Sequence, residues 1–238
     1  MDKGHKYWLN MLDGEPDIEL TSVTTLIAQY KPKFDAEFWS KRKSKEYEKE
    51  GFSISPSDIR KEWEENRDRS ASRGTRAHSA ISHFLLTGEL ASVDADIEGY
   101  FESFLAYYRN NTFDLIGRIE LPLGNEEWVL SGTPDFVGVV NGSRTIIDYK
   151  TSKKIETTSS RKMKDEASAL PDCELSHYSL QIQAYDTFMG GGYSLEIMHL
   201  DPNGLYPTTY RPVETRDTLE KIIGKHCGLA VSIPGRFD

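Results

Sequence analysis

The chain has 238 residues, of which 37% are hydrophobic and 28% charged, and its formal net charge is −9. This composition is typical of a globular protein, and a chain of this length can bury roughly 70–75% of its unfolded surface without a disulfide or a structural metal. The negative charge argues against a general nucleic-acid coat protein, which is normally basic. It does not exclude a nuclease, because carboxylates that bind a catalytic metal are themselves acidic.

Cysteine content and hydropathy indicate in which cellular compartment the protein is expected. Cys173 and Cys227 are too few for a disulfide scaffold or an all-cysteine iron–sulfur cluster, and we expect reduced thiols. The first residues lack an apolar signal-peptide core, and no apolar stretch approaches the roughly 18 residues of a membrane span. The sequence therefore predicts an intracellular, cytoplasmic protein without a membrane partner, in the host cytoplasm if the chain is phage-encoded.

The first third of the chain is predicted to be mainly helical. The expected elements are a hairpin of Tyr7–Leu12 and Ile18–Leu20 around Asp13-Gly14, a helix over Val23–Tyr30 capped by Ser22, a charged helix from Asp35 to about Glu50, and a further helix that starts at Ser57 or Asp58. Trp39 and Trp63 lie on the two charged helices. A tryptophan there could stack on nucleic-acid bases, but it more commonly anchors its helix to the core.

Helices and strands are mixed in the rest of the chain. The expected helices are Gly74–Leu86, ended by Gly88, Ile97–Tyr108, about Ser176–Met189 and about Thr215–Ala230. The expected strands are Leu115–Leu121, Trp128–Leu130, the hairpin described next, Ser194–His199 and Tyr206–Tyr210. This order indicates the α+β (mixed α/β) class in one domain, 1–238, with an N-terminal hairpin and helical region (1–73), a core segment (74–190) and C-terminal strands and a helix (191–238).

The most informative segment is a predicted hairpin of Phe136–Val140 and Arg144–Tyr149. Both runs are rich in β-branched and aromatic residues, and Asn141-Gly142 joins them. Asn-Gly is typical of a two-residue type I′ turn, because that turn needs a positive φ at both central residues.

This turn determines which residues face each other. Counting outward from Val140 and Ser143 places Asp135 opposite Asp148, where facing Cβ atoms are about 4.5–5.5 Å apart. Two carboxylates that close share a proton or hold a cation. Lys150 is two residues beyond Asp148 and therefore on the same face. Two oxygen ligands beside an ammonium suit a hard divalent metal and a phosphodiester, although an isolated Asp-x-Lys is usually an ordinary surface ion pair.

Two predicted helices carry polar groups that could join the hairpin. Gly74-Thr75-Arg76-Ala77-His78 places an imidazole at the edge of an apolar face, where a histidine is usually a core or boundary residue but can also bind Mn²⁺. Gln181 and Tyr185 are one turn apart and share a helix face. They could hold a phosphate oxygen or orient a catalytic lysine, or they could form an ordinary polar face.

The charge is distributed unevenly along the chain. Residues 85–136 contain ten acidic and two basic residues, whereas residues 149–164 contain six basic residues and one acidic residue. A mobile basic loop directly after the hairpin would suit a phosphate backbone, although a solvated loop rich in Ser and Thr would have the same composition. The candidate DNA-binding residues are Arg73, Arg76, Thr151, Ser152, Lys153, Lys154, Arg161, Lys162 and Lys164.

The order of these motifs resembles the RecB-type branch of the PD-(D/E)XK nucleases, which includes lambda-type phage exonucleases and the mitochondrial genome maintenance exonuclease. The order is G-x-x-x-H, an acid on a strand, P-D, twelve residues, D-x-K and Q-x-x-x-Y, over about residues 74–190. The matching positions are His78, Glu120, Asp135, Asp148, Lys150, Gln181 and Tyr185. Ser22–Leu26 also resembles, more weakly, the opening of small phage-encoded members of this branch. The chain lacks the cluster cysteines of the iron–sulfur members.

This resemblance implies a restriction-endonuclease-like core, with a central mixed sheet flanked by helices. It implies one or two Mg²⁺ or Mn²⁺ ions and no iron–sulfur cluster, and the metal ligands would be His78, Asp135, Asp148 and the backbone carbonyl of Tyr149. Lys150 would activate the attacking water or stabilise charge on the phosphate. Glu120 would bind a second metal or orient water, and Gln181 and Tyr185 would orient Lys150 or contact the scissile strand.

The predicted function is a metal-dependent DNA exonuclease of phage or bacterial recombination, repair or genome processing. Its partners would be single- or double-stranded DNA with a free end and, by analogy, a recombination or annealing protein. Three alternatives remain open: a structure-specific or nicking endonuclease of the same superfamily, a non-catalytic DNA-binding or assembly protein that retains the fold, and a metal hydrolase for another substrate. Gly-rich phosphate loops of the nucleotide-hydrolase kind are absent from the sequence.

Overall fold

The hairpin around Asn141-Gly142 lies at the centre of a five-stranded sheet in the computed structural model, which describes residues 7–9 and 18–228. The strand order is β3 (Phe113–Ile119), β6 (Phe136–Val140), β7 (Ser143–Lys150), β8 (Ser194–His199) and β9 (Thr208–Tyr210). β7 and β8 are parallel, and the other neighbours are antiparallel. The parallel pair arises because the crossover between β7 and β8 includes a helix, α5 (Glu174–Phe188).

The predicted register of the hairpin is confirmed. Val140 faces Ser143, and the pairs continue outward to Phe136 and Ile147. Asn141 and Gly142 have φ values of 49° and 74°, as a type I′ turn requires. The next positions outward are Asp135 and Asp148.

A second, four-stranded sheet has the order β1-β2-β5-β4. Its strands are β1 (Tyr7–Leu9), β2 (Ile18–Ser22), β5 (Leu130–Gly132) and β4 (Leu123–Asn125). β1 and β2 pair antiparallel as predicted, and the proposed turn at Asp13-Gly14 lies outside the described residues. β4 was not predicted, because a three-residue strand has no readable alternation.

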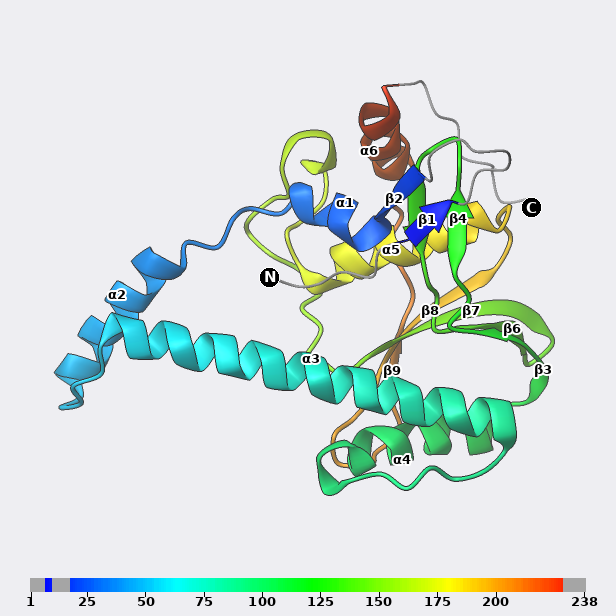
Figure 1. The fold of residues 1–238 in the computed structure, drawn as a ribbon, viewed down its shortest axis with the longest axis horizontal. Helices are drawn as coiled ribbons and strands as arrows, with labels where there is room; N and C mark the ends of the chain where they lie inside the picture. The colour runs from blue at the N-terminus through cyan, green and yellow to red at the C-terminus, as the bar shows by residue number, and fades with distance from the viewer. Residues whose placement is uncertain (1–6, 10–17, 229–238) are drawn as a thin grey trace.

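Helices cover both faces of the five-stranded sheet (Figure 1). Successive β7 residues alternate between two hydrophobic clusters: Ile146 packs with α1, α5 and α6, whereas Ile147 and Tyr149 pack with α3 and α4. The helix bounds are α1 (Val23–Gln29), α3 (Pro56–Thr87), α4 (Ala95–Asn110) and α6 (Arg216–Cys227). This alternation also directs Asp148 and Lys150 toward α5. The structure is therefore mixed α+β, as predicted.

The long helix α3 corrects one prediction. We expected two helices, one from Ser57 or Asp58 and one from Gly74, but a single 32-residue helix begins after Ser55, whose hydroxyl accepts the Asp58 N–H. Gly74 does not interrupt it, because one glycine only weakens a helix. The boundary proposed at residue 73 therefore falls inside α3. The caps predicted at Ser22 and Asp35 are confirmed, with bonds to the N–H groups of Thr25 and Phe38.

Helix α2 (Ala36–Lys49) and residues 56–69 of α3 project away from both sheets, and we call them the helical arm (Figure 1). Within the arm, Ser40 and Ser44 are buried against α3, and the Ser44 hydroxyl donates to the Ile54 carbonyl at 2.7 Å. Trp39 is 39% exposed and Trp63 is half-buried. The expectation that tryptophans anchor these helices to the core is therefore wrong, because small side chains make the close helix contact.

The predicted C-terminal elements are found within a few residues. The proposed last position of the final helix, Ala230, lies outside the described residues. Cys173 and Cys227 are both free thiols. Within the described ranges, every helix is too short or too polar to cross a bilayer.

Gly99 on α4 allows the β8–β9 connection to pack on this helix. A Cβ built there would lie 1.8 Å from the Pro202 carbonyl oxygen, which belongs to the backbone and cannot swing aside. We expect Gly99→Ala to lower the free energy of unfolding by about 1–3 kcal/mol, as overpacking does. Urea denaturation measures this, with exposed Glu98→Ala on the same helix as the control. A Gly99→Ala midpoint equal to that of the control would contradict the packing.

Candidate active site

Two carboxylates meet where β6 begins and β7 ends. Asp135 Oδ2 accepts the backbone N–H of Tyr149 at 2.7 Å, which ties the two strands together beyond their last ladder pair. Its Oδ1 lies 3.0 Å from Nδ1 of His78. The side chain of Asp148 is 4% exposed, and that of Asp135 is 13% exposed. The predicted carboxylate pair is thus an inward-facing, nearly dry cluster.

Lys150 is held inside this cluster by groups from β7 and α5. Its Nζ is 2.5 Å from Asp148 Oδ2 and donates to Gln181 Oε1 at 3.2 Å. The Gln181 amide nitrogen donates to the Tyr185 hydroxyl at 2.8 Å and to Asp148 Oδ1 at 3.3 Å. One amide therefore connects the lysine, the carboxylate and the phenol, which brings the predicted D-x-K and Q-x-x-x-Y motifs together.

Helix α3 contributes His78 and closes one side of the site. The imidazole also lies edge-on to the Tyr149 ring, with ring centroids 5.7 Å apart. A Cβ on Gly74 would lie 3.1 Å from Thr151 Oγ1, so the glycine allows α3 to pass close to the end of β7. The predicted G-x-x-x-H motif thus combines a close approach with a side chain that contacts Asp135.

Glu120 lies at the edge of this group. It is the residue after β3, with a φ of 47°, and its N–H donates to the Asp135 carbonyl at 3.0 Å. Its exposed carboxylate accepts a hydrogen bond from Ser82 at 3.1 Å, one turn beyond His78 on α3. We expected Glu120 on a strand, but the chain turns at this position. The backbone is tied to Asp135, and the carboxylate points to α3.

The pKa values of the two carboxyl groups are shifted in opposite directions. Burial raises the pKa of Asp148, and the opposing charge of Lys150 does not cancel this effect. Burial also raises the pKa of Asp135, but His78, Lys150 and the Tyr149 N–H together outweigh it and leave a lowered pKa. Burial lowers the pKa of Lys150, yet Asp148 and Asp135 outweigh it, so Lys150 stays an ammonium. A permanent ammonium suits stabilisation of phosphate charge better than proton abstraction.

The chemical types of the possible ligand atoms suit a hard divalent cation. It comprises two carboxylates, an imidazole whose Nε2 is the ring nitrogen not bonded to Asp135, and the carbonyl of Tyr149. Asp148 Oδ2 is a buried oxygen that lies 2.5 Å from the Lys150 ammonium. In the described part of the chain, however, no three His, Cys, Asp or Glu side chains converge as a ligand set. The metal remains a prediction.

The basic loop after β7 is partly paired with its own acids. Lys154 forms an ion pair with Glu156, and the Arg161 guanidinium lies 3.6 Å from Asp172. Lys162 donates to the Ala169 carbonyl at 3.3 Å. Lys153 is exposed, Lys164 is half-buried, and the Ser152 hydroxyl donates to the Lys154 carbonyl.

The two predicted arginines of α3 face α4 instead of the carboxylate pair. Arg76 forms ion pairs with Asp94 and Asp96. Arg73 lies over the Tyr100 ring, 5.6 Å from its centroid, and 4.0 Å from Asp96. Both residues therefore contribute to packing of α3 on α4.

Sequence reasoning missed two residues of this site. The Tyr178 ring lies under the Lys150 ammonium, with Nζ 4.1 Å from the ring centroid. Its position three residues before Gln181 puts it on the same helix face, a signal that could have identified it. Ser82 follows His78 by one turn and could have been found in the same way, but its partner Glu120 depends on tertiary structure.

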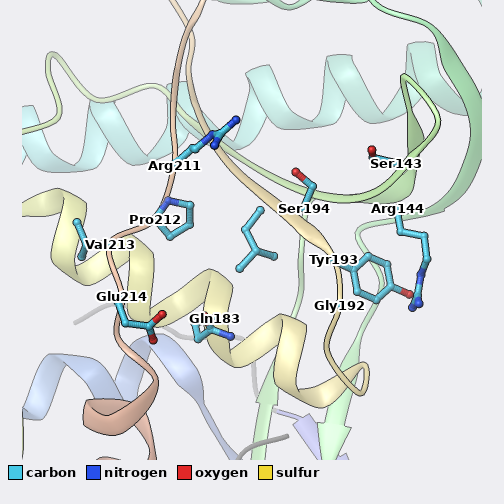
Figure 2. A pocket seen from close by; sticks show the side chains of 11 residues that line it. Ser143, Arg144, Gln183, Gly192, Tyr193, Ser194, Arg211, Pro212, Val213 and Glu214 are labelled. Carbon is cyan, nitrogen blue, oxygen red and sulfur yellow. The ribbon is translucent and has the colours of Figure 1, made fainter. Parts of the chain in front are cut away.

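A separate groove of about 650 Å³ lies near the opposite end of β7, around the β6–β7 turn. Its polar lining includes Arg144, Arg211 and Glu214, and Arg144 stacks on Tyr193 at 4.1 Å. Figure 2 shows Arg144 beside Tyr193 and Arg211 on another wall. We place the candidate site at the carboxylates because acids, ammonium and imidazole converge there, whereas volume alone implies no chemistry.

We compared the chain with known proteins. The chain matches no model of a known protein family, and no curated protein matches it.

The buried ion pair gives a test of the site that is independent of function. In Lys150→Met, Asp148 loses its counter-charge in a nearly dry site, which typically costs about 3–5 kcal/mol of stability. Denaturant unfolding at neutral pH measures the loss, and exposed Lys153→Met serves as the control. Equal stability of the two variants would show that Lys150 does not sit in the cluster.

Proposed function

We propose that this chain is a metal-dependent deoxyribonuclease with a PD-(D/E)XK core, and that it acts as an exonuclease. The observation that carries the proposal is the buried meeting of Asp135, Asp148 and Lys150 on adjacent strands. A protein that only binds DNA has no need for facing carboxylates, which repel phosphate and destabilise the sheet. The mixed sheet with helices on both faces supports the proposed core.

The proposed metal ligands are His78, Asp135, Asp148 and the carbonyl of Tyr149, for Mg²⁺ or Mn²⁺. When bound, such an ion would polarise the phosphodiester and lower the pKa of water. Lys150 would stabilise the charge that develops on the phosphate. Gln181 would keep the ammonium in place, and Tyr185 would fix the amide orientation of Gln181. Glu120, beside Ser82, would orient water or take part in a second metal site.

DNA binding is proposed through the basic loop, because a strand that reaches the carboxylates must pass the residues that follow Lys150. Of the predicted contacts, Lys153, Lys154, Arg161 and Lys162 are exposed. Thr151 lies at the junction of β7 and α3, where its hydroxyl could donate to a phosphate.

Strand topology of the substrate tests the proposal most directly. We expect end-labelled linear DNA to be degraded with Mg²⁺ or Mn²⁺, while closed circular DNA stays intact. Asp135→Asn and Asp148→Asn should abolish cleavage but keep DNA binding, because they remove negative charge next to the phosphate. The time course uses single- and double-stranded forms, and the labelled end reports polarity.

Each outcome of that experiment has a clear meaning. Cutting of circles would replace the exonuclease by an endonuclease. Cleavage by either asparagine variant in excess metal would refute the metal assignment. If the wild-type protein binds DNA tightly but cleaves none of the forms, the non-catalytic alternative is favoured.

The basic loop can be tested by salt dependence. Replacing Lys153, Lys154, Arg161, Lys162 and Lys164 with Gln should weaken binding to all sequences. It should also reduce the slope of log K against log salt by about 0.7–0.9 for each lost phosphate contact. Fluorescence anisotropy between low and moderate salt measures the slope, with exposed Lys221→Gln on α6 as the control. An unchanged slope would show that DNA runs elsewhere.

A further inference from the structure

We propose that an aromatic groove on the helical arm binds the single-stranded part of the DNA substrate by base stacking, an inference that rests on the proposed nuclease function. The groove has a volume of about 250 Å³ and lies between α2 and α3. Its lining residues are Phe34, Trp39, Arg42, Lys43, Glu46 and Trp63. We call it the arm groove.

Two of the three aromatic rings of the arm groove are exposed. Phe34 is 62% exposed and Trp39 is 39% exposed, and the Phe34 ring packs edge-on against Trp63 with centroids 5.6 Å apart. The close contact between α2 and α3 is made instead by small and aliphatic residues, such as buried Ser44 and Ile59. Large rings left open beside a groove need another explanation, because folding would favour their burial.

Charge distinguishes DNA from an uncharged apolar partner. The guanidinium of Arg42 lies over the Trp39 ring, 5.3 Å from its centroid. Glu46 lies 3.6 Å from Arg42 and 3.3 Å from Lys43, so the lining keeps one net positive charge. The whole of α2 has five basic and three acidic residues in a chain of net charge −9. Aromatic faces beside basic side chains are the usual surface for single strands.

The position of the groove on α3 suits a strand that also reaches the carboxylates. Trp63 and His78 lie on one continuous helix, 15 residues apart. At 1.5 Å per residue the separation is about 22 Å. It corresponds to about six or seven nucleotides at the roughly 3.4 Å rise of a stacked strand. The arm would therefore engage DNA at a fixed distance from the site of cleavage (Figure 1).

Single-stranded DNA is favoured over a duplex by the shape of this surface. In a duplex the base faces are already stacked on each other, so the arm groove could contact only base edges and phosphates. An unpaired strand can place a base face on Trp39 or Trp63. Alanine substitution of the aromatic residue in such a stack changes affinity roughly 5- to 150-fold.

Binding in metal-free buffer tests the arm groove without cleavage. The probes are fluorescent oligothymidines of 3 and 25 nucleotides and a blunt 25-base-pair duplex. We expect the Trp39→Leu, Trp63→Leu double variant to bind the 25-nucleotide strand at least about 10-fold more weakly, with little change for the duplex. Phe52→Leu, which replaces an exposed ring in the connection between α2 and α3 and outside the groove, should bind as the wild type does.

Cleavage gives a second readout that depends on length. A 3-nucleotide strand is too short, even when extended, to span from the carboxylates to the groove, so the double variant should cleave it as the wild type does. The variant should cleave the 25-nucleotide strand more slowly at subsaturating DNA. Equal binding and cleavage of the long strand by variant and wild type would overturn the proposal.

Two further measurements separate the remaining explanations. Photo-crosslinking of iodouracil-substituted 25-nucleotide DNA to the wild-type protein should label α2 or the Trp63 region, and labelling elsewhere alone would overturn the proposal even if the variant misfolds. A changed oligomeric state of the variant in sedimentation, with unchanged DNA affinity, would assign the groove to a second copy of this chain. If the wild type cleaves no DNA but the tryptophans still govern strand binding, the proposed nuclease function fails and the groove stands.

Discussion

The Lys150 ammonium lies in a nearly dry site, and a buried charge is tolerated only with partners that replace water. Asp148 supplies the counter-charge, and Gln181 accepts a hydrogen bond from the lysine. Asp135 adds a second negative charge, and His78 in turn holds that carboxylate. Strands β6 and β7, helix α5 and helix α3 are therefore all tied to one charged cluster. A change in any of these elements alters the environment of the same ammonium.

The same helix joins this cluster to the arm. Along its C-terminal half, α3 buries Ala77, Ile81 and Leu85 against α4 and the sheet. Its N-terminal half leaves the core and packs against α2 (Figure 1). Such a polar, solvent-exposed helical segment is stabilised by its cap and its partner helix instead of by a core. A rigid extension of this kind is useful where a second contact must lie at a set distance from a reaction.

Many acidic residues of the chain form ion pairs with basic residues close by. Acids at the start of α4 neutralise the α3 arginines, as the pairs of Arg76 with Asp94 and Asp96 show. Part of the basic loop is also paired, through Glu156 and Asp172. A phosphate backbone would have to compete with these partners, so affinity would rest on the residues that stay exposed. This arrangement favours a narrow DNA track over a broad basic face.

The sequence alone determined the hairpin and its register, because Asn141-Gly142 allows one turn type and strand side chains alternate with a period of two. From that register Asp135, Asp148 and Lys150 could be placed together, and the one-turn spacing of Gln181 and Tyr185 followed from helix geometry. Only the tertiary structure decided that α3 is continuous and that Glu120 turns toward Ser82. It also decided that Tyr178 underlies Lys150 and that the arm tryptophans lie outside the core. These features depend on contacts between residues far apart in the chain, and local propensity carries no information about which distant surface will cover a side chain.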